Sequence, residues 1–310
     1  MNTTGHLPKG VACASLTALN ADLSVDLPLT LAHNRWLLAN GCDAVVILGT
    51  TGEANSFTVE ERLALIEAVG ASDLPKDRMA IGTGCCAIPD TVRLSKAALA
   101  TGCRSLLLLP PFYYKNIGDD GLYASIAAAL DGIADPAMRV YLYHFPALTG
   151  VPFTAAVIER LLAAYPGVVV GLKDSSGDGD HMEALQRRFP GFEVFAGTEE
   201  HMLRMLRAGG AGTISATVNV TVKATVASYA AWQGPEADAR QAVVIAQRQA
   251  FAGYPFSSAI KEVMARETGI ASWRNVRPPF LPLAADRADA LSAKLAAAGF
   301  SLPALAQAAQ

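Results

Sequence analysis

Residues 140–173 read VYLYHFPALTGVPFTAAVIERLLAAYPGVVVGLK and contain one strand–helix–strand pattern. Its two ends, Val140–His144 and Val168–Lys173, are nearly continuous in apolar residues, which is typical of strands buried on both faces of a parallel sheet. Between them, Thr154–Ala164 has helical periodicity, and Thr154 is a suitable N-cap residue. This order of elements predicts a parallel β-α-β unit.

The same alternation recurs over the first two thirds of the chain. Eight strand-sized runs cover Gly10–Thr17, Asp43–Gly49, Met79–Gly84, Ser105–Leu109, Val140–His144, Val168–Lys173, Glu193–Gly197 and Gly212–Ala216. Eight βα units without a long linker predict a (β/α)8 TIM barrel of the α/β class. An open doubly wound sheet fits less well, because the first run is followed by Ala18-Leu19-Asn20 and not by a glycine-rich phosphate-binding turn.

The chain continues well beyond the eighth strand-like run. Residues from about 219 to 310 are too many for one barrel helix, and a proline-rich break at Trp273–Pro282 interrupts them. We therefore expect residues 1–225 to form the barrel and to contain the active site. Residues 226–310 are expected to form a C-terminal helical extension packed on the barrel.

The composition is that of a globular protein with a large core. Of the 310 residues, 52% are hydrophobic, and 25 Lys+Arg against 28 Asp+Glu give a formal net charge of −3. This balance excludes a basic nucleic-acid binder and an acidic disordered tail. No apolar run reaches the ~18–20 residues that span a bilayer, and residues 1–9 lack a secretory signal pattern, so we expect a cytoplasmic protein without membrane partners. The five cysteines predict buried thiols and no disulfide framework.

In a barrel of this class the active site lies at the carboxyl ends of the strands, so reactive residues there are the candidates. Lys173 ends the apolar run Val168–Lys173. Burial of its stem disfavours the ammonium form and would leave an amine that can attack a ketone. The alternative is a structural ion pair with Asp174 or another carboxylate, and position alone does not decide between the two roles.

Tyr143 ends the neighbouring run and favours the chemical role of Lys173, although a tyrosine there could also serve only for packing. An amine that attacks a carbonyl must lose protons and supply one to the departing hydroxyl, and a buried phenol can relay them. Thr50 and Thr51 follow the second run and precede Gly52. Their hydroxyls and the backbone N–H groups of such a turn can bind a carboxylate, although an ordinary turn uses the same residue types.

Three motifs occur at the ends of the second, fifth and sixth runs. They are Gly49-Thr50-Thr51-Gly52-Glu53, Tyr143-x-x-Pro146 and Gly171-x-Lys173. Together they resemble the dihydrodipicolinate synthase/N-acetylneuraminate lyase family. The resemblance implies class I, Schiff-base chemistry on pyruvate or another 2-keto acid, with no metal or organic cofactor. Lys173 would form the imine, Tyr143 would move protons, and the Thr50-Thr51-Gly52 turn would hold the carboxylate of the keto acid.

The resemblance also implies a homotetramer, built as a dimer of dimers. Tyr113, in the segment Pro111-Phe112-Tyr113-Tyr114, matches the family tyrosine that reaches the active site of a neighbouring subunit. It would complete a proton relay with Thr50 and Tyr143. The small-molecule partners would be a 2-keto acid, pyruvate, and an aldehyde.

Leu148 departs from the dihydrodipicolinate synthases, which usually carry an arginine at this place for the carboxylate of the aldehyde substrate. A leucine cannot bind a carboxylate with two parallel hydrogen bonds, so 4-hydroxy-tetrahydrodipicolinate synthase activity is disfavoured. The segments around Leu148 and Tyr113 are more similar to the N-acetylneuraminate lyase branch. Gly197-Thr198-Glu199-Glu200 resembles the sugar-hydroxyl contacts of that branch, so Gly197, Glu199 and Glu200 are expected to bind substrate. The alternative is that both glutamates only stabilise the first turn of a helix.

His144 and Ser175 complete the expected substrate site, although both differ from the sugar lyases. His144 replaces an asparagine and is either a second acid–base group near the imine or a hydrogen-bonded structural residue. Ser175 follows Lys173 in Asp174-Ser175-Ser176, a segment unlike that of the sugar lyases.

The sequence therefore predicts a lyase that makes or breaks a carbon–carbon bond between pyruvate and an aldehyde, with a hydroxylated 2-keto-3-deoxy acid as substrate. A 2-keto-3-deoxy acid dehydratase or an imino-acid deaminase could use the same lysine imine. A non-catalytic barrel that binds a keto acid is the alternative from another class. A metal-dependent aldolase is disfavoured because the five histidines show no ligand spacing at strand ends.

Overall fold

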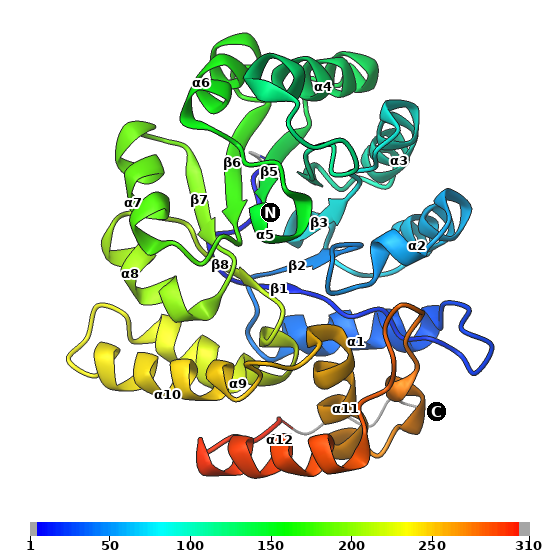
Figure 1. Ribbon diagram of the computed structural model, residues 1–310, viewed down its shortest axis with the longest axis vertical. Coiled ribbons are helices and arrows are strands. Elements are labelled where there is room, and N and C mark those ends of the chain that lie inside the picture. Colours follow the sequence, from blue (N-terminus) through cyan, green and yellow to red (C-terminus); the bar gives the residue numbers. More distant parts are fainter. Residues whose placement is uncertain (1–4, 304–310) are drawn as a thin grey trace.

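The computed structural model describes residues 5–303 and contains a closed barrel of eight parallel strands surrounded by helices (Figure 1). The strands are β1 (Gly10–Ala14), β2 (Ala44–Ile47), β3 (Met79–Gly82), β4 (Ser105–Leu108), β5 (Arg139–His144), β6 (Val169–Asp174), β7 (Glu193–Ala196) and β8 (Gly212–Ser215). Neighbours pair in sequence order, and β8 pairs with β1 to close the barrel. The predicted (β/α)8 barrel is confirmed.

The helices that follow the strands form the outer ring (Figure 1). They are α1 (Leu27–Ala39), α2 (Val59–Ala71), α3 (Ile88–Ala100), α4 (Gly118–Ile133), α6 (Ala155–Ala164), α7 (Gly179–Arg188), α8 (Met202–Arg207) and α9 (Val218–Ala230). Helix α2 begins with a capping box, in which Thr58 and Glu61 each accept the other's backbone N–H. The Thr154 hydroxyl caps α6, as predicted, by accepting the N–H of Val157.

Several short helical segments lie between these elements. Helix α5 (Pro146–Thr149) is a single turn between β5 and α6, with proline at its first position and Gly150 in the left-handed conformation after it. The 3-10 turns are η1 (Ala54–Ser56), η2 (Lys76–Arg78), η3 (Glu199–His201) and η4 (Ala271–Arg274). Helix α5 and turns η1 and η3 follow the carboxyl ends of strands, where they shape the rim of the barrel.

The barrel interior is filled by side chains from alternate strand positions. Small residues in β1, β2 and β3 leave room for large aromatic ones on other strands; the interior cluster includes Ala12, Ala14, Ala44, Ala80, Tyr141, Tyr143 and Phe195. At the amino-terminal end, the Tyr141 hydroxyl donates to Glu193 Oε2 (2.6 Å) and accepts the N–H of Leu7 (2.9 Å). The N-terminal segment thus packs across this end, and the opposite rim remains for a site.

The C-terminal part adds α10 (Ala237–Gln249), α11 (Phe256–Thr268) and α12 (Ala285–Ala297) beside the barrel (Figure 1). Its apolar cluster joins residues of the loop after β1, of α9 and of the segments after α10 and α11 to these helices: Leu16, Ala18, Val220, Phe251, Ile260, Met264, Trp273 and Leu291. The boundary expected after residue 225 falls within α9. Within residues 5–303, no helix combines the length and the apolar character needed to cross a membrane.

Candidate active site

Lys173 and Tyr143 lie opposite each other on β6 and β5, where the strand register pairs them directly. Both side chains are buried, and the Lys173 Nζ lies 4.4 Å from the centroid of the Tyr143 ring. The register also pairs Lys173 with Phe195 of β7, which belongs to the interior cluster. The structure therefore places an amine among aromatic side chains inside the barrel, next to a phenol.

Thr50 lies in the loop after β2 and contacts Tyr143. The Tyr143 hydroxyl donates to Thr50 Oγ1 at 3.4 Å, and both residues line a small cavity with Gly49 and Asn55. Because Thr50 accepts this hydrogen bond, its own hydroxyl proton remains available to a ligand. Thr51 is buried beside it. The structure thus brings together Lys173, Tyr143 and Thr50, three of the four residues expected to be catalytic.

The loop that carries the threonines has an unusual backbone. Leu48 (φ 54°) and Glu53 (φ 59°), which flank it, are both left-handed, a conformation that residues other than glycine seldom adopt. Gly82 of β3 makes the loop's path possible, since a Cβ there would lie 2.2 Å from the carbonyl oxygen of Leu48. The Thr17 hydroxyl also donates to the carbonyl of Gly52 at 2.9 Å. Surrounding contacts thus hold the loop in a strained shape.

Tyr113, the fourth residue expected to be catalytic, lies apart from the other three within a single chain. Its side chain is 74% exposed, and within residues 5–303 it makes no hydrogen bond to Thr50. Leu148 on α5 is 61% exposed. Lys115 Nζ donates to the carbonyl oxygens of Phe112 and Thr149, and these hydrogen bonds connect the segment that carries Tyr113 to α5, which carries Leu148.

Ser175 and Gly197 are adjacent at the ends of β6 and β7. The N–H of Gly197 donates to the carbonyl of Asp174 at 2.6 Å. A Cβ on Gly197 would lie 2.5 Å from the carbonyl oxygen of Asp174 and 2.7 Å from the Cα of Ser175, so this position requires glycine. Gly197 therefore lets the chain after β7 approach the end of β6 closely.

Glu199 does not face the rim. Its side chain is fully buried, and its carboxylate accepts hydrogen bonds from the hydroxyls of Ser215, Thr217 and Thr221, the last at 3.1 Å. Glu200 is partly buried; Gln249 donates to its carboxylate at 3.3 Å, and Thr198 Oγ1 lies 3.2 Å from it. In this structure Glu199 is thus inaccessible to a sugar hydroxyl.

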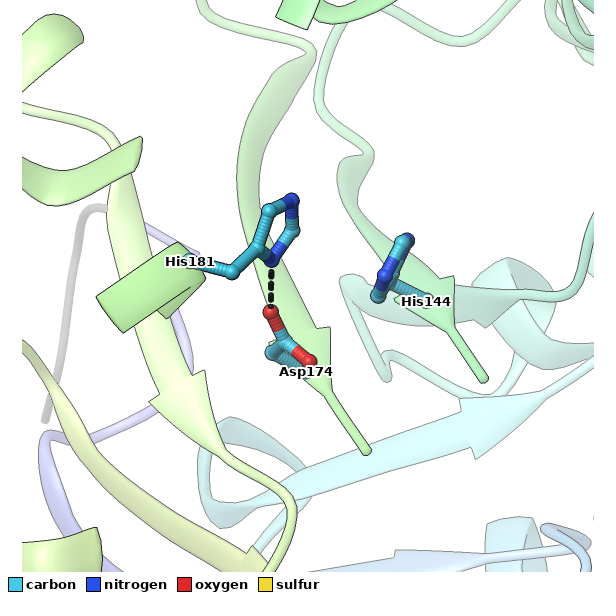
Figure 2. A group of neighbouring side chains, drawn as sticks. All are labelled: His144, Asp174 and His181. Carbon is cyan, nitrogen blue, oxygen red and sulfur yellow. Dashed lines mark hydrogen bonds and ion pairs between the residues drawn. The ribbon is translucent and has the colours of Figure 1, made fainter. Parts of the chain in front are cut away.

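His144 points away from the imine position. It lies with Asp174 and His181 outside the barrel, between the ends of β5 and β6 and the start of α7 (Figure 2). The N–H of Phe153 donates to its Nδ1 at 3.1 Å, and its ring stacks on that of His181 with centroids 4.8 Å apart. His181 Nδ1 donates to Asp174 Oδ2 at 2.7 Å. These contacts fit the structural alternative for His144, a hydrogen-bonded residue.

His144, Asp174 and His181 have side-chain types that bind metal ions. Their ligand atoms lie within 4.8 Å of one another, a proximity that sequence spacing did not reveal. However, Nδ1 of His144 already uses its lone pair to accept the N–H of Phe153, so the neutral ring carries its proton on Nε2 and offers no lone pair. The hydrogen bonds of this group thus do not fit a metal ion.

The electrostatics of the group fit an ion pair. Although burial alone would raise the pKa of Asp174, hydrogen bonds from His181 and Ser176 hold it below its ordinary value. The hydrogen bond to Asp174 raises the pKa of His181. Burial lowers the pKa of His144, which keeps that ring neutral.

Comparisons with known proteins place this geometry in a family. Residues 7–298 match the model of the dihydrodipicolinate synthetase family. An "uncharacterized DapA-like lyase" from Chloroflexus aurantiacus is 36% identical over 288 residues, which cover 92% of this chain and 95% of the relative.

Two solved structures superpose closely. Dihydrodipicolinate synthase from Agrobacterium tumefaciens matches with a TM-score of 0.86 and 31% identity, covering 93% of this chain and 98% of that one. YagE, an E. coli prophage protein of the dihydrodipicolinic acid synthase family crystallised with pyruvate, matches with a TM-score of 0.86 and 27% identity, covering 96% and 100%. The chain therefore belongs to the dihydrodipicolinate synthetase family and is an enzyme of the lyase class.

Proposed function

We propose that the protein is a class I aldolase that joins pyruvate to an aldehyde, or cleaves the corresponding 2-keto acid, through an imine on Lys173. The observation that carries this proposal is the grouping of Lys173 Nζ, the Tyr143 ring 4.4 Å away and the Thr50 hydroxyl at the same carboxyl-terminal rim. The pyruvate complex of YagE supports the choice of keto acid.

Each residue has a defined task in this reaction. The neutral amine of Lys173 adds to the keto carbon, and the resulting carbinolamine loses its hydroxyl as water with a proton from Tyr143. In the cleavage direction, the electrons of the breaking carbon–carbon bond move to the protonated imine, which becomes an enamine. Tyr143, now a phenolate, takes the proton of the neighbouring substrate hydroxyl as the aldehyde leaves. Thr50 and Thr51 hold the carboxylate of the keto acid.

The second substrate is proposed to be an uncharged, hydroxylated aldehyde, so that the cleaved compound is a 2-keto-3-deoxy acid. Leu148 is exposed on α5 and offers no charge to a second carboxylate. Lys115, the nearby cation, already donates to two backbone carbonyls. Ser175, Gly197 and Glu200 are proposed as contacts to the hydroxyl groups. Glu199 is left out because its carboxylate is buried among its own hydroxyl donors.

Tyr113 enters this proposal through a second subunit. Its side chain and that of Tyr114 are exposed on the single chain and contact each other edge to face. We propose that a homotetramer brings Tyr113 of one subunit next to Thr50 of another, where its hydroxyl extends the proton relay from Tyr143.

The test is intact mass after incubation with pyruvate and sodium borohydride, which reduces an imine to a stable amine. Wild type should gain the mass of one reduced pyruvate unit per chain, and Lys173→Ala should gain none. Lys223→Ala, which removes an exposed lysine of α9, is the matched control and should react like wild type. An unmodified wild-type protein would contradict the proposal.

A further inference from the structure

An ion pair between two fully buried side chains joins the loop after β2 to the C-terminal helices. This loop, residues 49–57, is called the threonine loop below. Glu53, the last residue of Gly49-Thr50-Thr51-Gly52-Glu53, accepts a hydrogen bond from Lys261 Nζ on α11, and both side chains are fully buried. Among the ion pairs of residues 5–303, this is the one with no exposure on either side. Lys261 is therefore attached directly to the loop that holds Thr50 and Thr51.

Every polar group of this pair has a partner. Lys261 Nζ also donates to the carbonyl of Asn275 at 2.8 Å, and the second carboxylate oxygen of Glu53 accepts the N–H of Arg277 at 2.8 Å. Two elements of the C-terminal part, α11 and the segment after η4, thus converge on one side chain of the loop. A buried pair satisfied in this way has a defined geometry, whereas apolar side chains of similar volume could fill the space without fixing one.

The backbone carries this constraint from Glu53 to the threonines. Glu53 is left-handed, and its N–H donates to the carbonyl of Thr50 at 3.1 Å. On the same side, the hydroxyl of Ser257, also on α11, donates to the carbonyl of Thr51 at 3.4 Å. A shift of the Glu53 side chain would therefore move the residues that are proposed to bind the keto-acid carboxylate.

Arg277 contacts the end of the same loop, at Ser56 and Phe57. Its guanidinium donates to the carbonyl of Ser56 at 2.8 Å and lies 4.6 Å from the centroid of the Phe57 ring. The segment after η4 thus contacts both Glu53 and the turn that follows it. The C-terminal part, which supplies none of the proposed reacting groups, therefore contacts the threonine loop through α11 and through the segment after η4.

We infer that Lys261 is a positioning residue, which acts through Glu53 to fix the Thr50–Thr51 turn for the carboxylate of the keto acid. The C-terminal extension is then part of the binding machinery as well as a support for the barrel. The statement about the keto acid rests on the proposed function, whereas the statement about the loop does not.

The experiment compares Lys261→Met with Glu262→Gln. Glu262 is the next residue of α11 and is also buried. Within residues 5–303 its carboxylate pairs with Arg266 and Arg274 and has no hydrogen bond to residues 49–57. Both variants are expected to lower the melting temperature. Only Lys261→Met should raise the pyruvate concentration that half-saturates borohydride trapping, by about tenfold, the loss expected from one hydrogen bond to a charged group.

A double variant separates positioning from stability. Glu53→Gln combined with Lys261→Met removes the unpaired buried carboxylate that would otherwise destabilise the single variant. The double variant should recover melting temperature, yet its half-saturating pyruvate concentration should stay raised because the bridge from α11 is still missing. It also serves as the test protein if Lys261→Met alone does not fold. A folded double variant with wild-type pyruvate dependence would overturn the inference.

Hydrogen exchange of residues 49–57 gives a readout that needs no substrate. Exchange there should be faster in the double variant and unchanged in Glu262→Gln. If wild type fails to trap pyruvate, the proposed function fails, and the exchange result alone decides whether Lys261 fixes the loop. Equal exchange in wild type and the double variant would refute that role.

Discussion

Strands β5 and β6 carry two paired sets of side chains, one residue apart, that face opposite sides of the barrel wall. Tyr143 and Lys173 point inward, and His144 and Asp174 point outward. The outward pair has the residue types most often used in acid–base catalysis, yet it packs against α7 and the backbone of Phe153. The two pairs thus differ in their surroundings: the inward pair lies in the barrel interior, whereas the outward pair contacts α7 and the backbone of Phe153.

The largest contrast is expected between Lys173→Ala and Asp174→Asn. Lys173→Ala should abolish turnover of a 2-keto acid substrate, because Lys173 supplies the amine that is paired with Tyr143 in the part of the chain that the structure describes. Asp174→Asn keeps the shape of the side chain at this position but weakens the hydrogen bond from His181. Turnover should therefore fall by less than about tenfold, while the free energy of unfolding falls by about 1–2 kcal/mol. Activity assays and urea unfolding of both variants measure this contrast. Loss of turnover in both would remove the distinction between the two faces.

Tyr143→Phe tests the inner face with a smaller expected effect. The ring still packs beside Lys173, but the hydroxyl that is proposed to move protons is gone, so kcat should fall by roughly 10²–10⁴-fold. The outer counterpart is His144→Asn, whose amide oxygen can still accept the N–H of Phe153. We expect that variant to keep kcat within about threefold of wild type. A large fall in kcat for His144→Asn would mean that the outer group takes part in the reaction.

Thr50→Val extends the comparison to the loop after β2. It removes the hydroxyl that accepts from Tyr143 and is proposed to bind the carboxylate, so KM for pyruvate should rise by roughly 10–100-fold. Thr50→Ser keeps the hydroxyl and should recover most of the loss. Equal KM values for wild type and Thr50→Val would exclude this loop from carboxylate binding.

The smallest expected effect is the pH dependence of the ion pair between His181 and Asp174. The pKa of His181 is raised, so its stabilisation is complete below its ordinary value of 6.5 and is lost as pH rises through the raised value. The pKa of Asp174 is lowered, so its stabilisation is complete above its ordinary value of 3.8 and is lost as pH falls through the lowered value. The pair therefore stabilises the fold most in weakly acidic solution.

His181→Asn measures that contribution. Because the side chain of His181 is about one third exposed, the variant should be less stable than wild type by only about 0.5–1 kcal/mol at pH 6 and by less at pH 9. Urea unfolding at the two pH values gives both differences. A difference that grows toward pH 9 would contradict the ion pair.

The sequence was informative where local pattern determines structure. Apolar runs and helical periodicity predicted the barrel, and strand ends identified Lys173, Tyr143 and Thr50 as neighbours, because parallel strands bring their carboxyl ends to one rim. The partners of Glu199 could not be predicted in this way, since Ser215 ends β8, Thr217 directly precedes α9 and Thr221 lies within α9. Glu53 and Lys261, 208 positions apart, meet only through the packing of α11 on the barrel.

The most direct test of the account is to locate the reduced pyruvate adduct by proteolysis and mass spectrometry of the peptides. We expect the modification on Lys173 and on no other lysine, and we expect His144→Asn and Asp174→Asn to retain it. An adduct on Lys115 at the rim, or adducts spread over several lysines, would contradict the central claim that the inward-facing pair of β5 and β6 carries the chemistry.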